Sequence, residues 1–461
     1  MFEASVYKNR RDNLKKKLNS GIVLMLGNQD VSMSYPANIF EFRQDSSFLY
    51  LFGLNEPMLA GVIDIDNNKD YIFGNDIDIE DVIWMGPQPS IKEKAQKVSV
   101  ENTNKFSDLH SFIKSAINKG QKIHFLPPYR AKNKILLNEL LNININNLKE
   151  NISIELIKAM VSLREVKEEV EIQEILKACD TSYLMHTTAM KMAKEGVLEK
   201  EIAGTIEGIA LAKGWGISFP VILSQNGETL HNHNHSQLLQ NGRLMLTDAG
   251  AETSMNYCSD NTRTVPVGGK FSTKQREIYE LVLAANNNVM KFVKPGVFYK
   301  EAHMIAAKTI TQGLMDLGLM KGNIDDAVEQ GAHTMFFPHG LGHQMGLDVH
   351  DMEDYGEDFV GYDETISRAS QFGTAYLRLA KKMKQGFVFT NEPGIYFIPA
   401  LIDKWKTEKI NNDFINFDKV NEYRSFGGIR LEDDLIITET ACKMMGKRIP
   451  ITVKEIEDLM L

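Results

Sequence analysis

The stretch RLMLTDAGAETSMNYCSDNTRTVPVG (residues 243–268) contains two apolar runs separated by the turn-forming run ETS (252–254). A hairpin folded about residue 254 would place Asp248 and Asp260, twelve positions apart, opposite each other on one side of the ladder. Two opposed carboxylates among apolar neighbours repel each other, which is costly unless a cation lies between them. The pair therefore predicts a metal site. The alternative is a shifted register that leaves both aspartates solvated in turns.

Two glutamates occupy similar positions later in the chain. Glu392 closes an apolar strand within TNEPG (390–394), and Glu432 interrupts another apolar strand two positions after Arg430, on the same face. Each carboxylate stands where an apolar residue would pack better. They extend the predicted metal site to four carboxylates. The alternative is a structural ion pair between Arg430 and Glu432, with Glu392 at an exposed strand end.

The segment HGLGHQMGLDVHD (339–351) contains three of the chain's 11 histidines, His339, His343 and His350. Its glycines disfavour a regular helix, although the first two histidines have helical spacing. No glutamate stands between those histidines, which excludes the HExxH zinc motif. A single histidine is commonly structural, but three in a glycine-rich loop predict a functional site.

Four carboxylates and one imidazole exceed the ligand set of a single catalytic zinc, and the imidazole is unusual for calcium. The set suits two divalent ions such as Mn²⁺ or Co²⁺. A pair of metal ions activates a water molecule and stabilises the oxyanion that develops on an attacked carbonyl. The sequence therefore predicts a hydrolase.

The flanking sequence predicts an α+β domain built from a repeated unit. Two amphipathic helices, at about 166–195 and 198–213, precede the strand pair that carries the aspartates. Two further helices precede the strand pair that carries the glutamates; one starts at a Ser272-x-x-Gln275 capping box, and the other covers about 299–317. Each half thus has the order helix, helix, strand, strand. This repeat predicts a pseudo-two-fold domain with one central site.

The first part of the chain has a different pattern. From about residue 20 to 158, short apolar runs alternate with polar, helical segments, which predicts a small α/β domain without a cluster of chemically active residues. We place the domain boundary between 157 and 158, which gives an N-terminal domain at 1–157 and a catalytic domain at 158–461.

Composition excludes several classes of protein. The chain has 461 residues and a formal net charge of -9, which disfavours nucleic-acid and anionic-membrane partners. Its three cysteines form no CxxC pattern, so neither a disulfide framework nor a zinc cluster is indicated. The N-terminal segment carries charges where a signal peptide needs its apolar run, and its apolar stretch at residues 21–26 is too short to span a membrane. We expect a cytoplasmic protein.

At the carboxylates and the histidine loop the chain resembles the M24 "pita-bread" metallopeptidases, a family that includes aminopeptidase P, prolidase and methionine aminopeptidase. FRQDSSFLYLFGLNEP (42–57) also resembles the N-terminal domain of the first two. By this resemblance Asp260 and Glu432 would bridge two metal ions, most simply Mn²⁺ with Co²⁺ or Zn²⁺ as alternatives. Glu392 would also move the proton of the attacking water. The implied ligands are Asp248, Asp260, His343, Glu392 and Glu432.

The resemblance implies further roles near the metals. His231, His339 and His350 match the family's histidines around the substrate, and His350 would stabilise the tetrahedral intermediate. Arg430 would orient the Glu432 and Asp260 side of the site. The neighbouring His233 and His235 have no such match, and we expect them to be structural or exposed to solvent.

The spacing of the ligands departs from short aminopeptidase P sequences. His343 and Glu392 are 49 positions apart, and Glu392 and Glu432 are 40 apart, which is closer to prolidases. Arg378 lies where similar prolidases have an arginine that reads the free carboxylate of a dipeptide, a task that suits a guanidinium. The alternative is that Arg378 is a surface residue of the helical run LRLAKKMKQG.

The resemblance implies removal of an N-terminal residue that precedes proline, as by aminopeptidase P. The alternative is a prolidase that cleaves only Xaa-Pro dipeptides. A metal-free amidinohydrolase and a non-catalytic peptide-binding homologue are more remote, because all five ligands are present. The expected partners are peptides with proline at the second position and further copies of the chain, as a dimer or tetramer.

Overall fold

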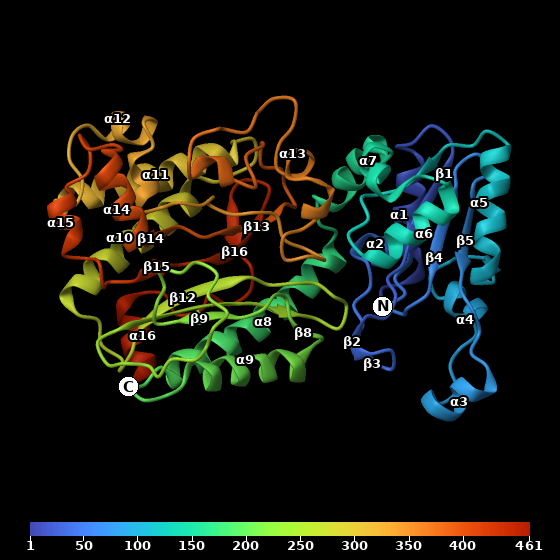
Figure 1. Cartoon of the computed structure of the whole chain (residues 1–461), viewed down its shortest axis with the longest axis horizontal. Coiled ribbons are helices and arrows are strands. Elements are labelled where there is room, and N and C mark those ends of the chain that lie inside the picture. Colours follow the sequence, from blue (N-terminus) through green and yellow to red (C-terminus); the bar gives the residue numbers. More distant parts are fainter. The chain divides into compact units, whose positions relative to one another are not determined.

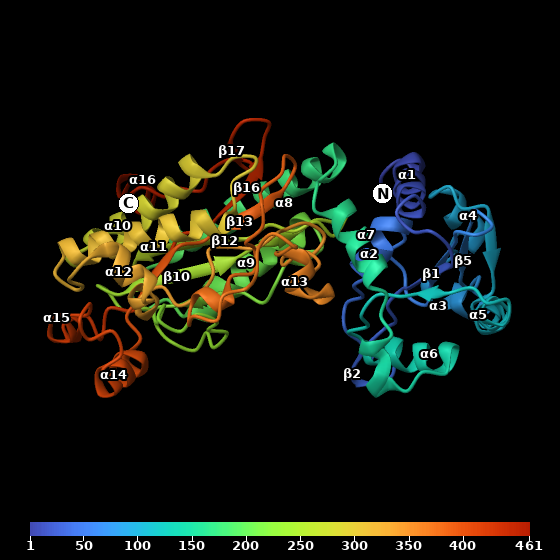
Figure 2. The same cartoon turned by 90° about the horizontal axis from the view of Figure 1, so that it is seen from above.

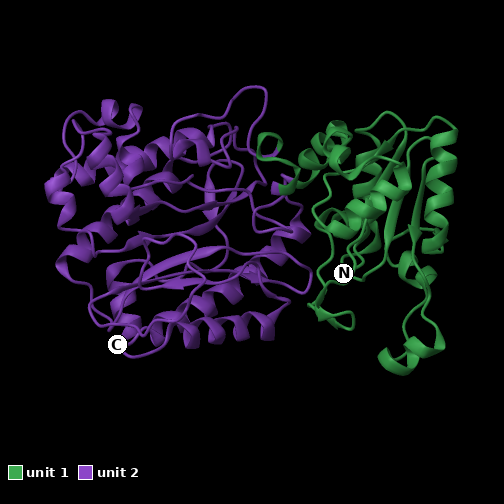
Figure 3. Cartoon of the chain, in the orientation of Figure 1, with its two compact units in different colours: residues 1–164, 354–359 green, residues 165–353, 360–461 purple.

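The structure is a computed structural model that describes residues 1–461. The chain forms two compact units. One contains Met1–Arg164 with Asp354–Phe359, and the other contains Glu165–Glu353 with Val360–Leu461 (Figure 3). The division lies seven residues beyond the boundary expected from the sequence, which falls inside helix α7 (Ile154–Arg164). This helix stays with the first unit because it packs there: Tyr50 donates a hydrogen bond from its hydroxyl to the carbonyl oxygen of Leu163 over 3.2 Å.

The first unit is built on a five-stranded sheet with the order β6-β5-β4-β1-β7 (Figure 1). Its central strands are the apolar runs seen in the sequence, because helices cover both faces of the sheet and bury the side chains on each. The strands are β1 (Ile22–Leu26), β4 (Ala60–Asp64), β5 (Lys69–Phe73), β6 (Asn102–Asn104) and β7 (Ile123–His124), with a separate hairpin of β2 (Ser32–Tyr35) and β3 (Asn38–Ile39).

Helices cover both faces of this sheet. Apolar residues of α5 and α6 pack against one face in a continuous core, and Phe52 of α2 packs on the other against Gly61, where a larger residue would collide with the ring. Besides α7, the helices are α1 (Ala4–Lys15), α2 (Ser46–Phe52), α3 (Ile79–Met85), α4 (Ile91–Gln96), α5 (Leu109–Asn118) and α6 (Ala131–Leu141), with 3-10 turns at Phe106–Asp108 and Ile145–Glu150.

The second unit repeats one arrangement twice, which confirms the α+β duplication. In Figure 1 the helix pair α8/α9 lies below the strands and the pair α10/α11 lies above them, and Figure 2 shows the same unit turned by 90°. The first half contains α8 (Glu169–Met192), α9 (Glu199–Lys213), β8 (Gly216–Ile217), β9 (Ile222–Ser224), β10 (Leu244–Ala249), β11 (Ala251–Glu252) and β12 (Asn261–Pro266). The second contains α10 (Thr273–Phe292), α11 (Tyr299–Asp316), β13 (Val388–Asn391), β14 (Gly394–Tyr396), β15 (Gly428–Arg430), β16 (Asp433–Ile437) and β17 (Cys442–Met444).

The two halves meet at the strands that carry the carboxylates. Thr262 of β12 forms a β-bridge with Glu432, which lies between β15 and β16. The predicted capping box is present at α10, where Ser272 accepts a hydrogen bond from the amide of Gln275 over 3.3 Å. The remaining helices are α12 (Ile324–Glu329), α13 (Glu357–Val360), α14 (Pro399–Glu408), α15 (Phe417–Asn421) and α16 (Val453–Met460), with 3-10 turns at Ala332–Met335, Glu353–Tyr355 and Thr374–Tyr376.

The register of the β10/β12 hairpin differs from the one expected. Asp248 lies opposite Thr262 rather than Asp260, because the turn is centred one residue later than predicted. Asn256 enters the left-handed region there, with a φ of 64°. The partner of Asp248 is thus two residues later in the chain than expected. Because side chains alternate along a strand, a difference of two residues leaves Asp248 and Asp260 on the same side of the hairpin. The prediction of directly opposed aspartates was wrong, but the side they share was right.

None of the helices combines the length and the apolar composition that a membrane-spanning segment requires. The three cysteines, Cys179, Cys258 and Cys442, form no disulfide bond.

Candidate metal centre and active site

The second unit contains a cavity of about 880 Å³, within the range of roughly 300–1,000 Å³ usual for ligand pockets. Five separate segments bring the five predicted ligands to its wall. Asp248 comes from β10, Asp260 precedes β12, His343 lies in the glycine-rich loop, Glu392 follows β13, and Glu432 precedes β16.

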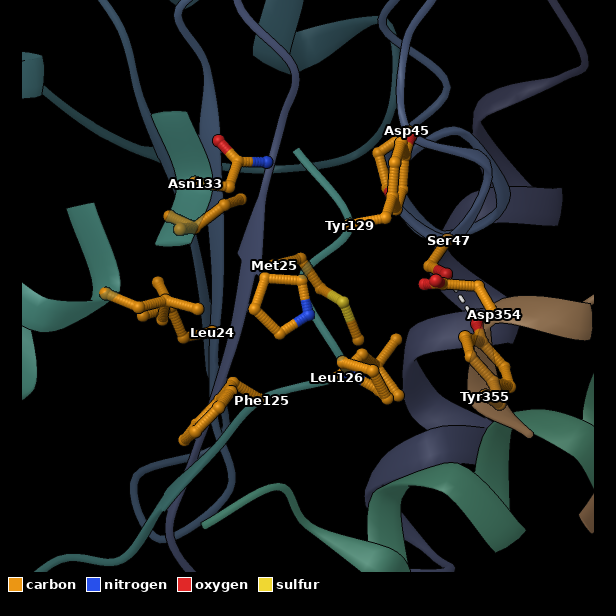
Figure 4. Close-up of a pocket in the computed structure, with 14 residues that line it drawn as sticks. Leu24, Met25, Asp45, Ser47, Phe125, Leu126, Tyr129, Asn133, Asp354 and Tyr355 are labelled. Carbon is orange, nitrogen blue, oxygen red and sulfur yellow. Dashed lines mark hydrogen bonds between the residues drawn. The ribbon is translucent and has the colours of Figure 1, made fainter. Parts of the chain in front are cut away.

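The first unit has a much smaller pocket of about 40 Å³ (Figure 4). Leu24, Met25 and Phe125 give it apolar walls, and the hydroxyls of Ser47 and Tyr355 are hydrogen-bonded at one end of it. Such a volume holds water but no peptide. The cavity of the second unit is therefore the candidate active site.

Ligand atoms of the five residues form overlapping groups. Asp248, Asp260 and Glu432 have carboxylate oxygens that all lie within 4.8 Å of one another, and the same limit holds for His343, Glu392 and Glu432. A third group joins Asp260 and His343 to His350. Asp260, His343 and Glu432 each belong to two of the three groups, so the groups share ligands and adjoin one another. The groups thus describe two adjacent cation positions.

The charges of this cluster need compensation. Burial raises the pKa of Asp260 well above its ordinary value, and repulsion from Glu432 and Asp248 raises it further. Burial likewise raises the pKa of Glu392 to about 7. The Oδ1 atoms of Asp248 and Asp260 are buried and make no hydrogen bond with the protein. Hard oxygen donors of this kind, with one imidazole, fit divalent cations.

Arg430 organises one side of the cluster. Its Nη2 donates to Oδ2 of Asp248 over 2.6 Å, its Nη1 donates to the Tyr396 hydroxyl over 2.9 Å, and its Nε donates to Oγ1 of Thr262 over 3.1 Å. Thr262 donates in turn to Oε2 of Glu432 over 2.7 Å. Arg430 was expected to orient the side of the site that holds Glu432 and Asp260. It reaches Glu432 only through Thr262, and its direct ion pair is with Asp248.

The sequence analysis missed one residue of this network, Thr262, and favoured a core position for another, Tyr396. Thr262 carries no signal by itself, although the correct hairpin register would have placed it opposite Asp248. Tyr396 ends an apolar strand and resembles an ordinary core aromatic. Its hydroxyl lies 2.9 Å from Nε2 of His339, so it links that histidine to Arg430.

The glycine-rich loop needs its glycines for close packing. A side chain at Gly342 would approach the carbonyl oxygen of Thr390 to 2.1 Å, so only glycine lets this loop lie against β13. The hydroxyl of Thr390 accepts a hydrogen bond from the amide of His343 over 3.2 Å. Burial lowers the pKa of His339 to about 3, with a further contribution from Arg430, so its ring is neutral at neutral pH.

His350 and Arg378 share one acidic partner, Glu353, which the sequence analysis did not select. Nδ1 of His350 contacts one oxygen of Glu353, and Nε of Arg378 donates to the other over 3.1 Å. The His350 ring lies 4.0 Å from that of His343. Arg378 lines the cavity from a non-helical segment, so the alternative of a surface helix was wrong.

The remaining predicted residue, His231, lines the cavity and is exposed to it. His233 also lines the cavity, where it is exposed, which agrees with the expected solvent-facing position. His235 lies outside the lining, with Nε2 at 3.1 Å from the carbonyl oxygen of Val221.

Comparisons with known proteins agree with this geometry. Residues 173–439 match metallopeptidase family M24, and residues 7–124 match the aminopeptidase P N-terminal domain. Human Xaa-Pro dipeptidase is 31% identical over 459 residues, which cover 95% of this chain and 88% of that protein. A probable Xaa-Pro aminopeptidase of Aspergillus clavatus is 33% identical over 429 residues, which cover 91% and 88%.

Solved structures give the same result. A variant of Escherichia coli aminopeptidase P in complex with substrate superposes with a TM-score of 0.82 at 27% identity, covering 100% of this chain and 98% of that one. The same enzyme with the inhibitor Pro-Leu gives a TM-score of 0.81. The family match spans more than half of the chain, and relatives above 30% identity cover nearly all of it. The chain therefore belongs to metallopeptidase family M24.

Proposed function

We propose that the chain is an Xaa-Pro aminopeptidase, which hydrolyses the bond between an N-terminal residue and a following proline. The observation that carries this proposal is the cluster of four carboxylates and one imidazole in the wall of a peptide-sized cavity. Relatives named as Xaa-Pro aminopeptidases and the structural similarity to aminopeptidase P support it. Proline has no N–H and a fixed φ, so this bond requires a dedicated enzyme.

Asp248, Asp260, His343, Glu392 and Glu432 are the residues that we propose to hold two divalent ions. When bound, these ions would activate water and stabilise the negative charge that develops on the attacked carbonyl. Mn²⁺ suits the predominance of carboxylates, with Co²⁺ or Zn²⁺ as alternatives. Metal analysis of protein purified without chelator tests this assignment, and the absence of any tightly bound or activating ion would contradict it.

The chain's own groups would handle the proton and the substrate. Glu392 would take the proton of the attacking water and pass it to the leaving proline nitrogen; its Oε2 lies 3.7 Å from Nδ1 of His339. His350 would donate to the tetrahedral intermediate from the ring edge opposite Glu353. His231 and His339 would bind the substrate, and Arg430 would position Asp248.

Prolidase is the second candidate, and Arg378 is the observation that favours it. This guanidinium lines the cavity, where it could bind the free carboxylate of a dipeptide, and human Xaa-Pro dipeptidase is among the relatives. The deciding experiment gives Mn²⁺-loaded protein an Xaa-Pro dipeptide and the same peptide extended by several residues. We expect cleavage of the extended peptide. Cleavage of the dipeptide alone would identify a prolidase, and cleavage of neither would favour a non-catalytic homologue.

We also propose a homo-oligomer. Helix α3 of the first unit exposes large apolar side chains, with Ile79, Ile83 and Trp84 exposed by 73%, 72% and 86%. Neighbouring apolar side chains exposed to this degree are typical of interaction surfaces. Sedimentation analysis should show a dimer or tetramer, and I83E should shift it toward the monomer. A monomeric parent protein would contradict the proposal.

The expected cytoplasmic location is retained as a proposal, supported by the absence of a disulfide bond among the three cysteines. Fractionation of the source cells tests it.

A further inference from the structure

Part of the cavity wall comes from two segments that contain none of the proposed metal ligands, residues 372–378 and residues 398–404. The Phe372 ring lies 6.4 Å from the Trp405 ring of α14 and 6.1 Å from that of Tyr376. The two segments therefore pack against each other. We call their larger cavity-lining residues the outer wall: Phe372, Tyr376, Arg378, Ile398, Leu401 and Lys404.

The outer wall exposes apolar surface. Phe372 is 43% exposed and Tyr376 is 55% exposed, although both rings line the cavity. Exposed aromatic rings in a concave site are suited to contact a ligand rather than to stabilise the fold. This part of the cavity can therefore receive residues of a peptide beyond the bond that is cut.

The cavity lining contains three lysine or arginine side chains, and they differ in their partners. Arg430 is paired with Asp248, and Arg378 is paired with Glu353. Lys404 is exposed and makes neither a hydrogen bond nor an ion pair in the structure. Its charge is therefore available to a bound molecule.

The charged residues Asp403 and Lys406, which flank Lys404 on α14, have partners of opposite charge within the protein. Asp403 accepts two hydrogen bonds from Arg424, at 2.6 and 2.8 Å, and Lys406 lies 3.7 Å from Asp418. Neither Asp403 nor Asp418 pairs with Lys404, and Glu408, four positions later on α14, forms no ion pair with it in the structure, so a carboxylate of a bound peptide can pair with Lys404.

Arg378 and Lys404 lie at different depths from the metal ligands. Arg378 is linked to the ligand cluster through Glu353 and His350, whose ring lies 4.0 Å from that of His343, whereas Lys404 is an exposed residue of α14 with no such link. Each further residue of an extended peptide adds roughly 3.5 Å. A carboxylate on the residue after proline would therefore lie farther out than the carboxylate of a dipeptide.

We propose that Lys404 binds a carboxylate carried by the residue after proline, and so favours peptides with a negative charge at that position. The inference rests on the proposed aminopeptidase function and names a substrate class for it. The carboxylate has two sources, the free C-terminus of a tripeptide or an acidic side chain in a longer peptide.

The test compares kcat/KM for four peptides that share Ala-Pro. Ala-Pro-Ala is used as the free acid and as the amide, and Ala-Pro-Glu amide is compared with Ala-Pro-Gln amide. The parent enzyme should prefer the charged member of at least one pair by about threefold, the size expected for an exposed ion pair. The first pair reports the C-terminus and the second reports the side chain. In K404A the preference should fall to about one, and in K404E it should reverse.

K406A is the matched control, because Lys406 lies on the same helix but outside the cavity lining. It should keep the parent preference, and added salt should weaken that preference in the parent. Equal preferences in the parent and K404A would overturn the role of Lys404 while leaving the aminopeptidase function intact. A metal-loaded parent that cleaves none of the four peptides would reject the proposed function, and the inference with it.

Discussion

Arg430 and Asp248 form a buried ion pair in which Nη2 donates to Oδ2 over 2.6 Å, while Oδ1 of Asp248 has no hydrogen-bond partner. The pairing holds one oxygen of the carboxylate and leaves the other facing the acidic cluster. Arg430 therefore sets the direction in which Asp248 can bind a cation. The same guanidinium holds Thr262, which holds Glu432, so one side chain positions two of the proposed ligands.

R430K should weaken metal binding. Lysine keeps the charge but cannot reach three partners with the fixed geometry of a guanidinium. We expect metal affinity to fall about 10- to 100-fold, with a parallel loss of kcat/KM. Calorimetric titration with Mn²⁺ measures the affinity. R424K is the control, because Arg424 forms an exposed pair with Asp403. Unchanged affinity in R430K would show that Asp248 needs no such support.

E392Q should separate metal binding from turnover. Glutamine keeps one oxygen at this position but cannot take up a proton as a carboxylate does. We expect a folded protein that retains most of its metal and loses about 10²- to 10⁴-fold in kcat. Metal content and single-turnover rates check this. E408Q, at an exposed position of α14, should behave as the parent. Substantial turnover in E392Q would reject the proton-transfer role.

K167M should destabilise the second unit. Nζ of Lys167 lies 2.9 Å from Oδ2 of Asp351, and both side chains are only 1% exposed. Removing one partner leaves a buried charge uncompensated, which costs about 3–5 kcal/mol. Thermal unfolding should show a clear fall in midpoint, part of which K167M/D351N should recover. K177A removes a lysine that is 66% exposed and should change little. An unshifted midpoint in K167M would indicate that water or another group compensates Asp351.

H303F should reduce the acid sensitivity of the protein. His303 lies 6.4 Å from the ring of His333, and neither of its nitrogens has a hydrogen-bond partner. Burial lowers the pKa of His303 from 6.5 to about 3. The unfolded chain therefore binds a proton near pH 6.5 that the folded chain excludes, so stability is complete above pH 6.5 and falls as the pH decreases toward 3.

Between pH 7 and pH 5 this one histidine should cost about 2 kcal/mol of unfolding free energy. Denaturant unfolding of the parent and H303F at both pH values measures the difference, and carboxylate titrations common to both proteins cancel. H110Q changes an exposed histidine and should keep the parent pH dependence. Equal pH dependence in H303F and the parent would mean that His303 is protonated in the folded state.

Local patterns in the sequence were sufficient to predict the architecture of the second unit. Apolar periodicity and the capping box at Ser272 predicted α10, and the repeated helix and strand order predicted the two-fold domain. These features depend on residues close in sequence, whose physical preferences act over one turn or one strand. The family followed from the same residues, because the carboxylates stand where packing disfavours them.

Features that require segments far apart in the sequence to meet were determined only by the tertiary structure. The hairpin register turned on the conformation of Asn256, which no apolar pattern specifies. Thr262 and Tyr396 acquire their roles through Arg430, 168 and 34 positions away, and Glu353 joins His350 to Arg378, which lies 25 positions beyond Glu353. Their residue types are equally common in cores and loops. Which polar atom a buried side chain meets is a property of the packed site, and sequence alone does not determine it.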